Sequence, residues 1–209
     1  METGYPIYGR NLEPQPVPKE PKQTPWSYIS DWLQVIVIAL LISLPIRFFI
    51  AEPFIVNGAS MDPTFSTGQF LIIDRISYRF EAPQRGDVIV FKYPNDPSVY
   101  YIKRIIGLPG EIVGIENGKV RICGEQECIA PYQSLKEPYI ADSHVSHDTL
   151  RITLGSDEYF VMGDNRAQSS DSRAWGPLKA DLIVGRPIVR LLPFNGMSIL
   201  PGEYRQPQQ

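Results

Sequence analysis

The sequence predicts an all-β domain of antiparallel strands over residues 51–200, preceded by one transmembrane helix. After residue 50, short apolar runs alternate with turn residues, and no amphipathic helix of convincing length occurs. Asn117-Gly118 joins two of these runs and is the dipeptide typical of a tight β-hairpin. With 209 residues, the chain is long enough for one such domain with an anchor and tails.

The first 31 residues are predicted to be a flexible, cytoplasmic tail. Proline fixes the backbone and lacks an N–H group, so a proline-rich stretch opposes helices and central strands. The prolines before the first strongly apolar segment are Pro6, Pro14, Pro16, Pro18, Pro21 and Pro25. A shorter C-terminal tail is expected over residues 201–209.

Residues 32–50, WLQVIVIALLISLPIRFFI, are predicted to form a transmembrane anchor. As a helix they span about 28 Å, close to the hydrocarbon thickness of a bilayer. A buried core helix would show a polar face, which residues 35–42 lack, and a cleavable signal peptide would begin with a short basic segment. Lys19 and Lys22 precede the segment, whereas residues 51–70 contain no Lys or Arg. The main domain is therefore expected on the extracytoplasmic side of a single-pass protein.

Seven runs within residues 51–200 have the length and composition of strands. They are residues 70–75, 87–93, 100–106, 111–115, 119–122, 158–162 and 182–191. Further turns are predicted at Asp62-Pro63 and at residues 107–110.

Charge and cysteine usage exclude some functions and leave one question open. A formal net charge of −3 argues against nucleic-acid binding, which relies on clustered Lys and Arg. Cys123 and Cys128 could form a disulfide in an extracytoplasmic domain, or bind zinc with His144 and His147. The spacing of these four residues does not match a zinc finger, so no metal is expected.

Residues 57–64, NGASMDPT, place a serine between small neighbours and an Asp-Pro turn. Small neighbours allow a substrate backbone to approach Ser60 and leave amide groups available to an oxyanion. Taken alone, the pattern is a weak signal and favours a serine in a surface turn.

Lys103 lies in an apolar predicted strand, with Tyr101 and Ile105 on the same face. Loss of hydration would favour the neutral amine and make this lysine a candidate base. A lysine pointing to solvent from an edge strand is the plainer alternative. Neither histidine lies in a motif suited to a Ser-His-Asp triad, so a serine enzyme would need such a base.

A dense polar stretch, residues 162–176, directly follows another predicted strand. A solvated loop would explain the polarity of this stretch but would not explain the presence of Trp175 between Ala174 and Gly176. A folded hydrogen-bond network fits better, with Asp171 and Arg173 able to form a pair.

These three segments, in this order, resemble the type I signal peptidases of bacteria and their organellar relatives. The resemblance rests on GxSMxPT around Ser60, YIKRxxGLPG around Lys103 and GDNRxxSxDSRxWG at residues 163–176. It extends from the apolar segment to about residue 190. It implies a membrane-bound serine endopeptidase with the β-fold of this family. Without a cofactor, such an enzyme would remove N-terminal signal peptides from exported preproteins.

The resemblance also implies a role for each matching position. Ser60 would be the nucleophile and Lys103 the general base, acting through an acyl-enzyme. Ser169 would orient the lysine, with Asp171 and Arg173 as a supporting pair. Shallow apolar pockets would accept small residues at positions −1 and −3 before the cut, with walls formed by Phe54, Val56, Tyr101 and Ile102.

Two further positions bear on the expected site. Met61 follows the nucleophile, as the family pattern requires. Gly58 departs from the pattern, because some members carry a serine there that donates a hydrogen bond to the oxyanion. The Ser60 amide, or another donor such as water, is expected to take over that role.

Other protein classes fit less well. Self-cleaving transcriptional repressors share Ser–Lys chemistry on a related β-fold, but residues 1–31 are too short and proline-rich for a DNA-binding domain. A non-enzymatic, membrane-tethered β-domain that binds an envelope partner remains the alternative. The expected partners are signal-peptide-bearing preproteins and the lipid bilayer, with no nucleic acid; nothing in the sequence indicates the oligomeric state.

Overall fold

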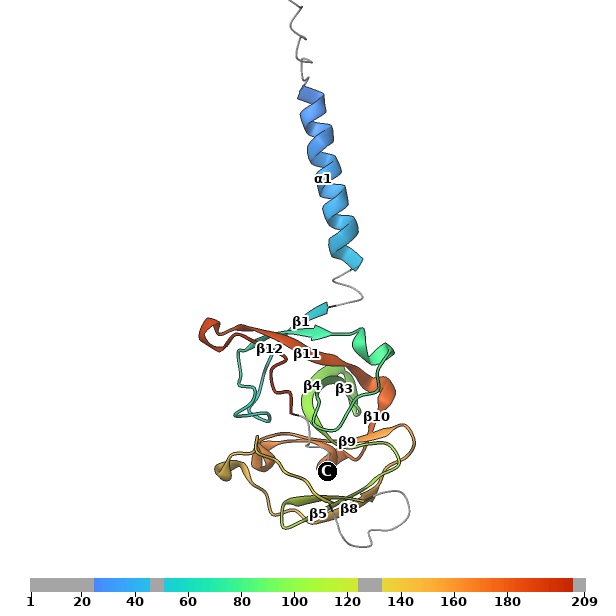
Figure 1. The fold of residues 1–209 in the computed structure, drawn as a ribbon, viewed down its shortest axis with the longest axis vertical. Coiled ribbons are helices and arrows are strands. Elements are labelled where there is room, and N and C mark those ends of the chain that lie inside the picture. Colours follow the sequence, from blue (N-terminus) through green and yellow to red (C-terminus); the bar gives the residue numbers. More distant parts are fainter. Residues whose placement is uncertain (1–24, 46–50, 124–132, 205–209) are drawn as a thin grey trace, which may run out of the picture. The chain divides into compact units, whose positions relative to one another are not determined.

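A computed structural model describes the backbone of residues 25–45, 51–123 and 133–204. The chain divides into two compact units, Met1–Ile42 and Ser43–Gln209. The first unit contributes a helix and the second contains the β-strands (Figure 1).

The helix α1 (Pro25–Pro45) begins earlier than the apolar segment predicted from the sequence. Its first residue is a proline, which loses no hydrogen bond at that position because the N–H group there has no partner within the helix. Residues 25–31, predicted as part of the tail, are therefore helical. The rest of that predicted tail and residues 46–50 of the predicted anchor lie outside the described residues.

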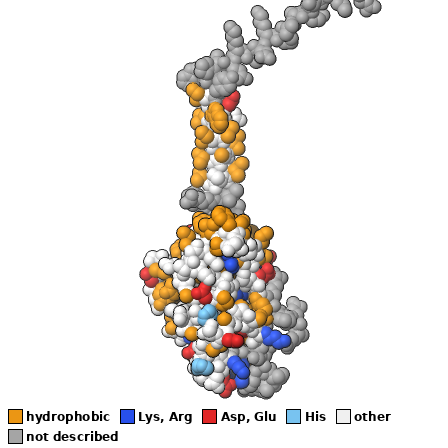
Figure 2. Space-filling model, turned by 90° about the vertical axis from the view of Figure 1, so that its left-hand side faces the viewer, with side chains coloured by type: hydrophobic (Ala, Val, Ile, Leu, Met, Phe, Trp, Pro, Cys, Tyr) orange, Lys and Arg blue, Asp and Glu red, His pale blue; other side chains and the backbone are white. Residues whose placement is uncertain are grey.

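The described side chains of α1 are mostly apolar and exposed. Between Ile29 and Leu44 the large hydrophobic side chains are 45–69% exposed, and they cover the face drawn in Figure 2. Asp31 is the one ionisable residue in that range. No helix in the described parts of the chain, however, has both the length and the apolarity that crossing a bilayer requires.

The described part of the β unit contains two sheets, in which neighbouring strands are antiparallel throughout. In the larger sheet the strands follow the order β1 (Ala51–Ile55), β2 (Phe70–Asp74), β11 (Ile183–Leu192), β3 (Val88–Tyr93), β4 (Asp96–Gly107), β9 (Glu158–Met162) and β10 (Leu178–Lys179), with β12 (Ser198–Ile199) paired to β11. The smaller sheet has the order β7 (Gln133–Ser134), β6 (Lys119–Cys123), β5 (Ile112–Glu116) and β8 (Leu150–Thr153). The class predicted from the sequence, an antiparallel β-domain, is confirmed.

All seven predicted runs form strands, and the predicted hairpin joins β5 to β6. Asn117 and Gly118 have φ angles of 50° and 76°, as a turn of this kind requires at both central residues. Five of the strands in the described residues were not predicted: β1, β7, β8, β10 and β12. A single-turn helix, α2 (Ser172–Trp175), follows the polar stretch after β9.

Within the described residues, three buried hydrophobic clusters join the strands. One packs beneath β1 and β2 and consists of Val56, Met61, Phe65, Leu71, Ile73, Val88 and Val90. A second lies on the opposite face of β3 and consists of Ile89, Phe91, Ile105, Tyr159, Val161 and Leu178. The third joins β9 to the smaller sheet and consists of Ile106, Val113, Ile115, Val120, Ile122, Leu154, Phe160 and Met162. Successive side chains of a strand point to opposite faces, so β3 and β4 contribute to more than one cluster.

Candidate active site

The candidate nucleophile, Ser60, lies in the turn between β1 and β2. The amide of Asp62 donates to the carbonyl of Ala59 at 3.2 Å, and the amide of Phe65 donates to that of Met61 at 2.9 Å. The side chains of Met61 and Phe65 are buried in the cluster beneath β1. The residue that follows the serine is thereby fixed in the core, which restricts the position of Ser60.

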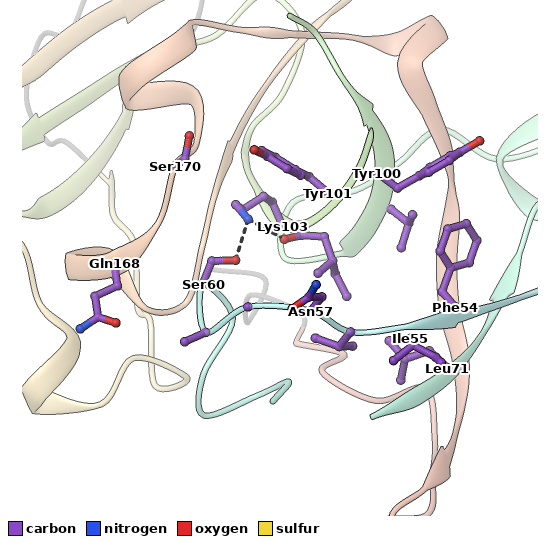
Figure 3. Close-up of a pocket in the computed structure, with 15 residues that line it drawn as sticks. Phe54, Ile55, Asn57, Ser60, Leu71, Tyr100, Tyr101, Lys103, Gln168 and Ser170 are labelled. Atoms are coloured by element: carbon purple, nitrogen blue, oxygen red, sulfur yellow. Dashed lines mark hydrogen bonds between the residues drawn. The ribbon is translucent and has the colours of Figure 1, made fainter. Parts of the chain in front are cut away.

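Lys103 projects from β4 toward this turn (Figure 3). Its Nζ lies 2.7 Å from Ser60 Oγ and 2.9 Å from the carbonyl oxygen of Ile102. The ring of Tyr101, two residues earlier on the same face, lies 5.1 Å from Nζ. The lysine is only 3% exposed, which rules out the alternative of a solvent-facing edge-strand residue.

Burial determines the protonation of this lysine. Loss of hydration disfavours the ammonium form and lowers the pKa of Lys103 from 10.5 to about 8, although the charges of Asp171 and Asp164 oppose the change. A substantial fraction of the amine is then neutral slightly above pH 7, with its lone pair available to accept a proton. Ser60 Oγ is within hydrogen-bond distance of that lone pair.

A cavity of about 300 Å³ opens beside the two residues. Its lining comprises Phe54, Ile55, Val56, Asn57, Gly58, Ala59, Ser60, Leu71, Val90, Tyr100, Tyr101, Ile102, Lys103, Gln168 and Ser170. The four residues predicted as pocket walls, Phe54, Val56, Tyr101 and Ile102, are all among them. Phe54 and Tyr100 are in edge-to-face contact, with ring centroids 5.2 Å apart. The cavity thus has an apolar end formed by β1 and β4.

Gly58 and Ser60 differ in the availability of their backbone amides. The Gly58 amide donates to Thr67 Oγ1 at 3.0 Å, and its φ of +105° is one that residues other than glycine rarely adopt. Among the described residues, none accepts a hydrogen bond from the Ser60 amide. Of these two amides, the Ser60 amide is therefore the one available to donate to an oxyanion.

Asp171 and Arg173 form the pair predicted from the sequence. The guanidinium Nε and Nη2 donate to the two carboxylate oxygens at 2.8 Å each. Asp171 also accepts from the amide of Gly163 at 3.1 Å, and Arg173 donates to the carbonyl of Arg166 at 2.8 Å. The pair thus braces both ends of the loop that approaches Ser60.

Ser169, which was predicted to orient Lys103, makes no hydrogen bond to that lysine in this structure. Its Oγ is buried and has no hydrogen-bond partner among the described residues. A Cβ added to Gly163 would come within 2.3 Å of both Ser169 Oγ and the carbonyl oxygen of Ser60. The loop therefore packs directly on the nucleophile turn, and this contact requires glycine at position 163.

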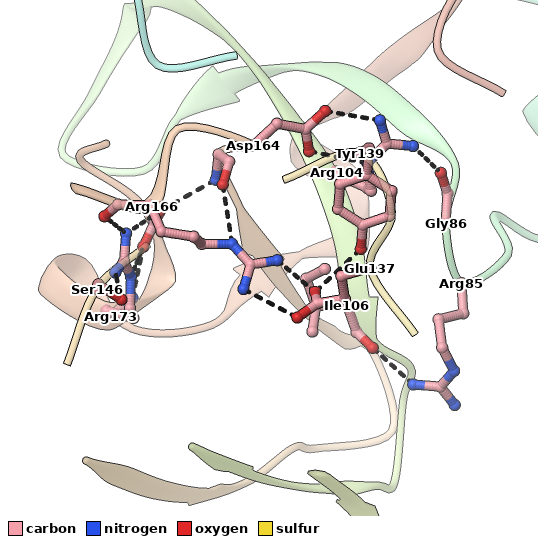
Figure 4. Close-up of polar contacts among 12 residues, drawn as sticks. Arg85, Gly86, Arg104, Ile106, Glu137, Tyr139, Ser146, Asp164, Arg166 and Arg173 are labelled. Carbon is pink, nitrogen blue, oxygen red and sulfur yellow. Dashed lines mark hydrogen bonds and ion pairs between the residues drawn. The ribbon is translucent and has the colours of Figure 1, made fainter. Parts of the chain in front are cut away.

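A buried ion pair that the sequence did not predict supports the nucleophile turn. Arg104 Nε and Nη2 donate to the two carboxylate oxygens of Asp164 at 2.9 and 2.7 Å, and Arg104 also stacks on the ring of Tyr139 (Figure 4). Asp164 in turn accepts from Thr64 Oγ1 at 2.5 Å. Arg104 and Asp164 are at most 1% exposed. The sequence signal for this pair was that Arg104, in the motif around Lys103, and Asp164, in the polar stretch after β9, had no role assigned to them.

Asn165 makes a second set of contacts with the nucleophile turn that was not predicted from the sequence. Its amide donates to the carbonyl of Ser60 at 3.0 Å, and its Nδ2 donates to the carbonyl of Ala59 at 3.1 Å. The loop after β9 is thereby hydrogen-bonded to the nucleophile itself.

No group of three or more His, Cys, Asp and Glu is arranged to hold a metal ion within the described ranges. Cys123 is disulfide-bonded, so it has no thiolate to offer to zinc. Cys128 lies outside the described residues.

Comparisons with known proteins point to one family. A family model described as signal peptidase, peptidase S26, matches residues 29–192. A probable signal peptidase I-1 from Synechocystis is 36% identical over 84% of this chain and 88% of the relative. A signal peptidase I from Leptolyngbya laminosa is 37% identical over 89% of this chain and 90% of the relative. A crystal structure of a signal peptidase I from Enterococcus faecalis, 30% identical, aligns with 51% of this chain and 97% of its own, at a TM-score of 0.42.

Proposed function

Because the chain belongs to the signal peptidase family of S26 peptidases, and is thus a serine endopeptidase, we propose that it removes signal peptides from exported preproteins, with Ser60 as nucleophile and Lys103 as general base. The observation that carries this assignment is the 2.7 Å contact between Lys103 Nζ and Ser60 Oγ beside an open cavity. The lowered pKa of the lysine supports its role as a base.

In the first half of the reaction, neutral Lys103 accepts the proton of Ser60 while Oγ attacks the carbonyl carbon at the cleavage site. The Ser60 amide donates to the resulting oxyanion. The ammonium of Lys103 then returns the proton to the departing nitrogen, which becomes the N-terminus of the mature protein. An ester between Ser60 and the signal peptide remains.

In the second half, Lys103, neutral again, accepts a proton from a water molecule that attacks the ester carbonyl. Collapse of this intermediate releases the signal peptide as a carboxylic acid and restores the Ser60 hydroxyl, with the proton returned from Lys103. In this proposal Ser169 orients Lys103 during turnover; its buried Oγ has no other hydrogen-bond partner among the described residues. Asp171 and Arg173 hold the loop that carries Ser169 in place.

The apolar end of the cavity supports the proposed preference for small residues at positions −1 and −3. Phe54 and Val56 of the β1 segment and Tyr101 and Ile102 of β4 all line the cavity, and Phe54 and Ile102 pack against the buried cluster that contains Val56. A space of about 300 Å³ shared by several substrate residues leaves little room for large side chains.

We further propose that residues 32–50 anchor the enzyme in a membrane, with the N-terminus cytoplasmic and the β unit extracytoplasmic. The exposed apolar surface of α1 supports this, because such a surface is unfavourable in water. Extraction of membranes at alkaline pH should leave the full chain in the pellet and release a chain that begins at residue 51. Release of both would contradict the anchor.

The activity is tested by incubating the full chain, in mild detergent, with a preprotein that carries an Ala-x-Ala site. Wild type and the control variant Lys92→Ala, whose lysine is exposed on the neighbouring strand, should cut at that site. Ser60→Ala and Lys103→Ala should be folded and inactive. Cutting by either folded variant would contradict the assigned roles. Failure of wild type to cut would favour the non-enzymatic binding domain.

A further inference from the structure

One end of the active-site cavity is polar and is not used by the mechanism above. Figure 3 shows Ser60 and Lys103 between two groups of lining residues: Phe54, Ile55 and Leu71 on one side, and Gln168 and Ser170 on the other. Gln168 and Ser170 are exposed, and their side-chain polar atoms have no hydrogen-bond partner among the described residues. The cavity therefore continues past the nucleophile into a region that offers a carboxamide and a hydroxyl.

The polar end is held in a fixed position relative to Ser60. Gln168 ends the 3-10 turn that begins at Arg166, and its amide donates to the carbonyl of Asn165 at 3.1 Å. Asn165 is hydrogen-bonded to Ser60 and Ala59, and the Asp171 carboxylate accepts from the backbone where this loop begins. Groups on such a braced loop can bind a substrate without a large cost of ordering.

The direction of a bound substrate follows from the chemistry at Ser60. The carbonyl carbon under attack must lie at Ser60 Oγ, so the residues before and after the cut extend to opposite sides of the serine. The apolar end receives the residues before the cut in the proposed function. The residues after the cut, which begin the mature protein, then extend toward Gln168 and Ser170.

We infer that Gln168, with Ser170 beside it, forms a subsite for the first two residues of the mature protein, positions +1 and +2. A carboxamide carries both donor and acceptor and can pair with the N–H and C=O of one peptide group. Such pairing holds an extended backbone without selecting a particular side chain, which suits an enzyme whose substrates differ after the cut. This inference rests on the proposed function.

The inference is tested by placing a charge at position 168 and opposite charges in the substrate. Matched preprotein substrates carry Lys or Asp at +1, and Lys or Asp at +2, with the same Ala-x-Ala site. The ratio of kcat/KM for Lys over Asp is measured for the full-chain wild type, Gln168→Glu, Gln168→Lys and the control Gln84→Glu. Gln84 is exposed and does not line the cavity.

Relative to wild type, Gln168→Glu should raise the Lys-over-Asp ratio by about fivefold at +1 or +2, and Gln168→Lys should lower it by a similar factor, since exposed charge pairs contribute modestly. Both effects should shrink as salt is added. The Gln84 variant should match wild type.

Three results would overturn the inference. Unchanged ratios in both Gln168 variants, with normal cutting by wild type, would refute the subsite and leave the proposed function intact. A change confined to discrimination at −1 would place Gln168 on the other side of the cut. Absence of cutting by wild type would refute the proposed function and, with it, this inference.

Discussion

Replacement of Lys103 by methionine should abolish activity and, at neutral pH, stabilise the protein. Methionine has a similar length and no charge, so it removes the buried amine without leaving a large cavity. Lys103 is held at 3% exposure with a pKa of about 8, which means that folding at pH 7 buries a largely protonated amine. The cost of burying this charge should therefore lower the free energy of unfolding of the wild-type protein at pH 7.

The magnitude follows from the two pKa values. The difference between 10.5 for an exposed lysine and about 8 in the folded chain corresponds to about 3 kcal/mol that opposes folding below pH 8. Methionine also loses the hydrogen bonds to Ser60 Oγ and the Ile102 carbonyl, each contributing about 1 kcal/mol. Lys103→Met should therefore raise the unfolding free energy by about 1 kcal/mol at pH 7.

The sign of the effect depends on pH. Between pH 8 and 10.5 the unfolded chain binds more protons at this lysine than the folded chain does, so the unfolding free energy of wild type rises with pH. The advantage of the methionine variant is complete below pH 8 and should become a deficit of about 2 kcal/mol near pH 10.5. Other groups titrate alike in both proteins and cancel in the difference.

The assay is urea unfolding of the full chain in mild detergent at pH 7 and pH 10.5, for wild type, Lys103→Met and Ser60→Ala. The serine variant removes one hydrogen bond without a charge, so it should lose about 1 kcal/mol at either pH. A stability difference between wild type and Lys103→Met that is the same at both pH values would refute the lowered pKa and the reasoning built on it.

Three further predictions concern catalysis and the loop after β9. The kcat/KM for a preprotein should rise about tenfold per pH unit below pH 8 and level off above it, because only the neutral base accepts a proton; a flat profile from pH 6 to 9 would contradict this. Asp164→Asn, which breaks the buried pair with Arg104, should lose about 3–5 kcal/mol of stability in denaturant unfolding, whereas Asp157→Asn in an exposed pair should lose under about 1 kcal/mol. Gly163→Ala should lower kcat by about tenfold or more in steady-state assays, because the added Cβ displaces Ser60; an unaffected kcat would refute the required contact.

The strands that the sequence predicted are those whose own residues carry the signal. Apolar runs in β3, β4 and β9 are long enough to be recognised without their partners, and Asn117-Gly118 identifies a hairpin from two residues. The class of the fold follows from such local patterns, because each strand buries at least one face.

The strands that were missed depend on their neighbours. β1 contains Pro53, which lacks a donor and which pattern analysis excludes from central strands, yet β1 lies at a sheet edge and pairs only with β2. The strands β7, β10 and β12 have two residues each, so hydrogen bonds to a partner define them. No local pattern could have indicated them.

The active-site residues divide in the same way, into those with a local sequence signal and those that depend on distant partners. Ser60 and Lys103 could be selected because their motifs are contiguous, and the structure brings them together. The supporting contacts of Asp164 were not predictable, because its partners Arg104 and Thr64 lie 60 and 100 residues away in the sequence. Ser169 was predicted to orient the lysine, but its hydroxyl has no partner in this structure; that role stays a prediction.

The alternation of side chains along β4 makes the identity of the base depend on strand register. Lys103 and Arg104 are adjacent, so one points to the cavity and the other to the buried Asp164. A slip of one residue would exchange them and present a guanidinium to Ser60. Arginine keeps its proton at every pH at which proteins are folded, so the slipped enzyme would be inert. The pairing of β4 with β3 and β9 is thus also the means by which this fold keeps a permanently charged neighbour away from the serine.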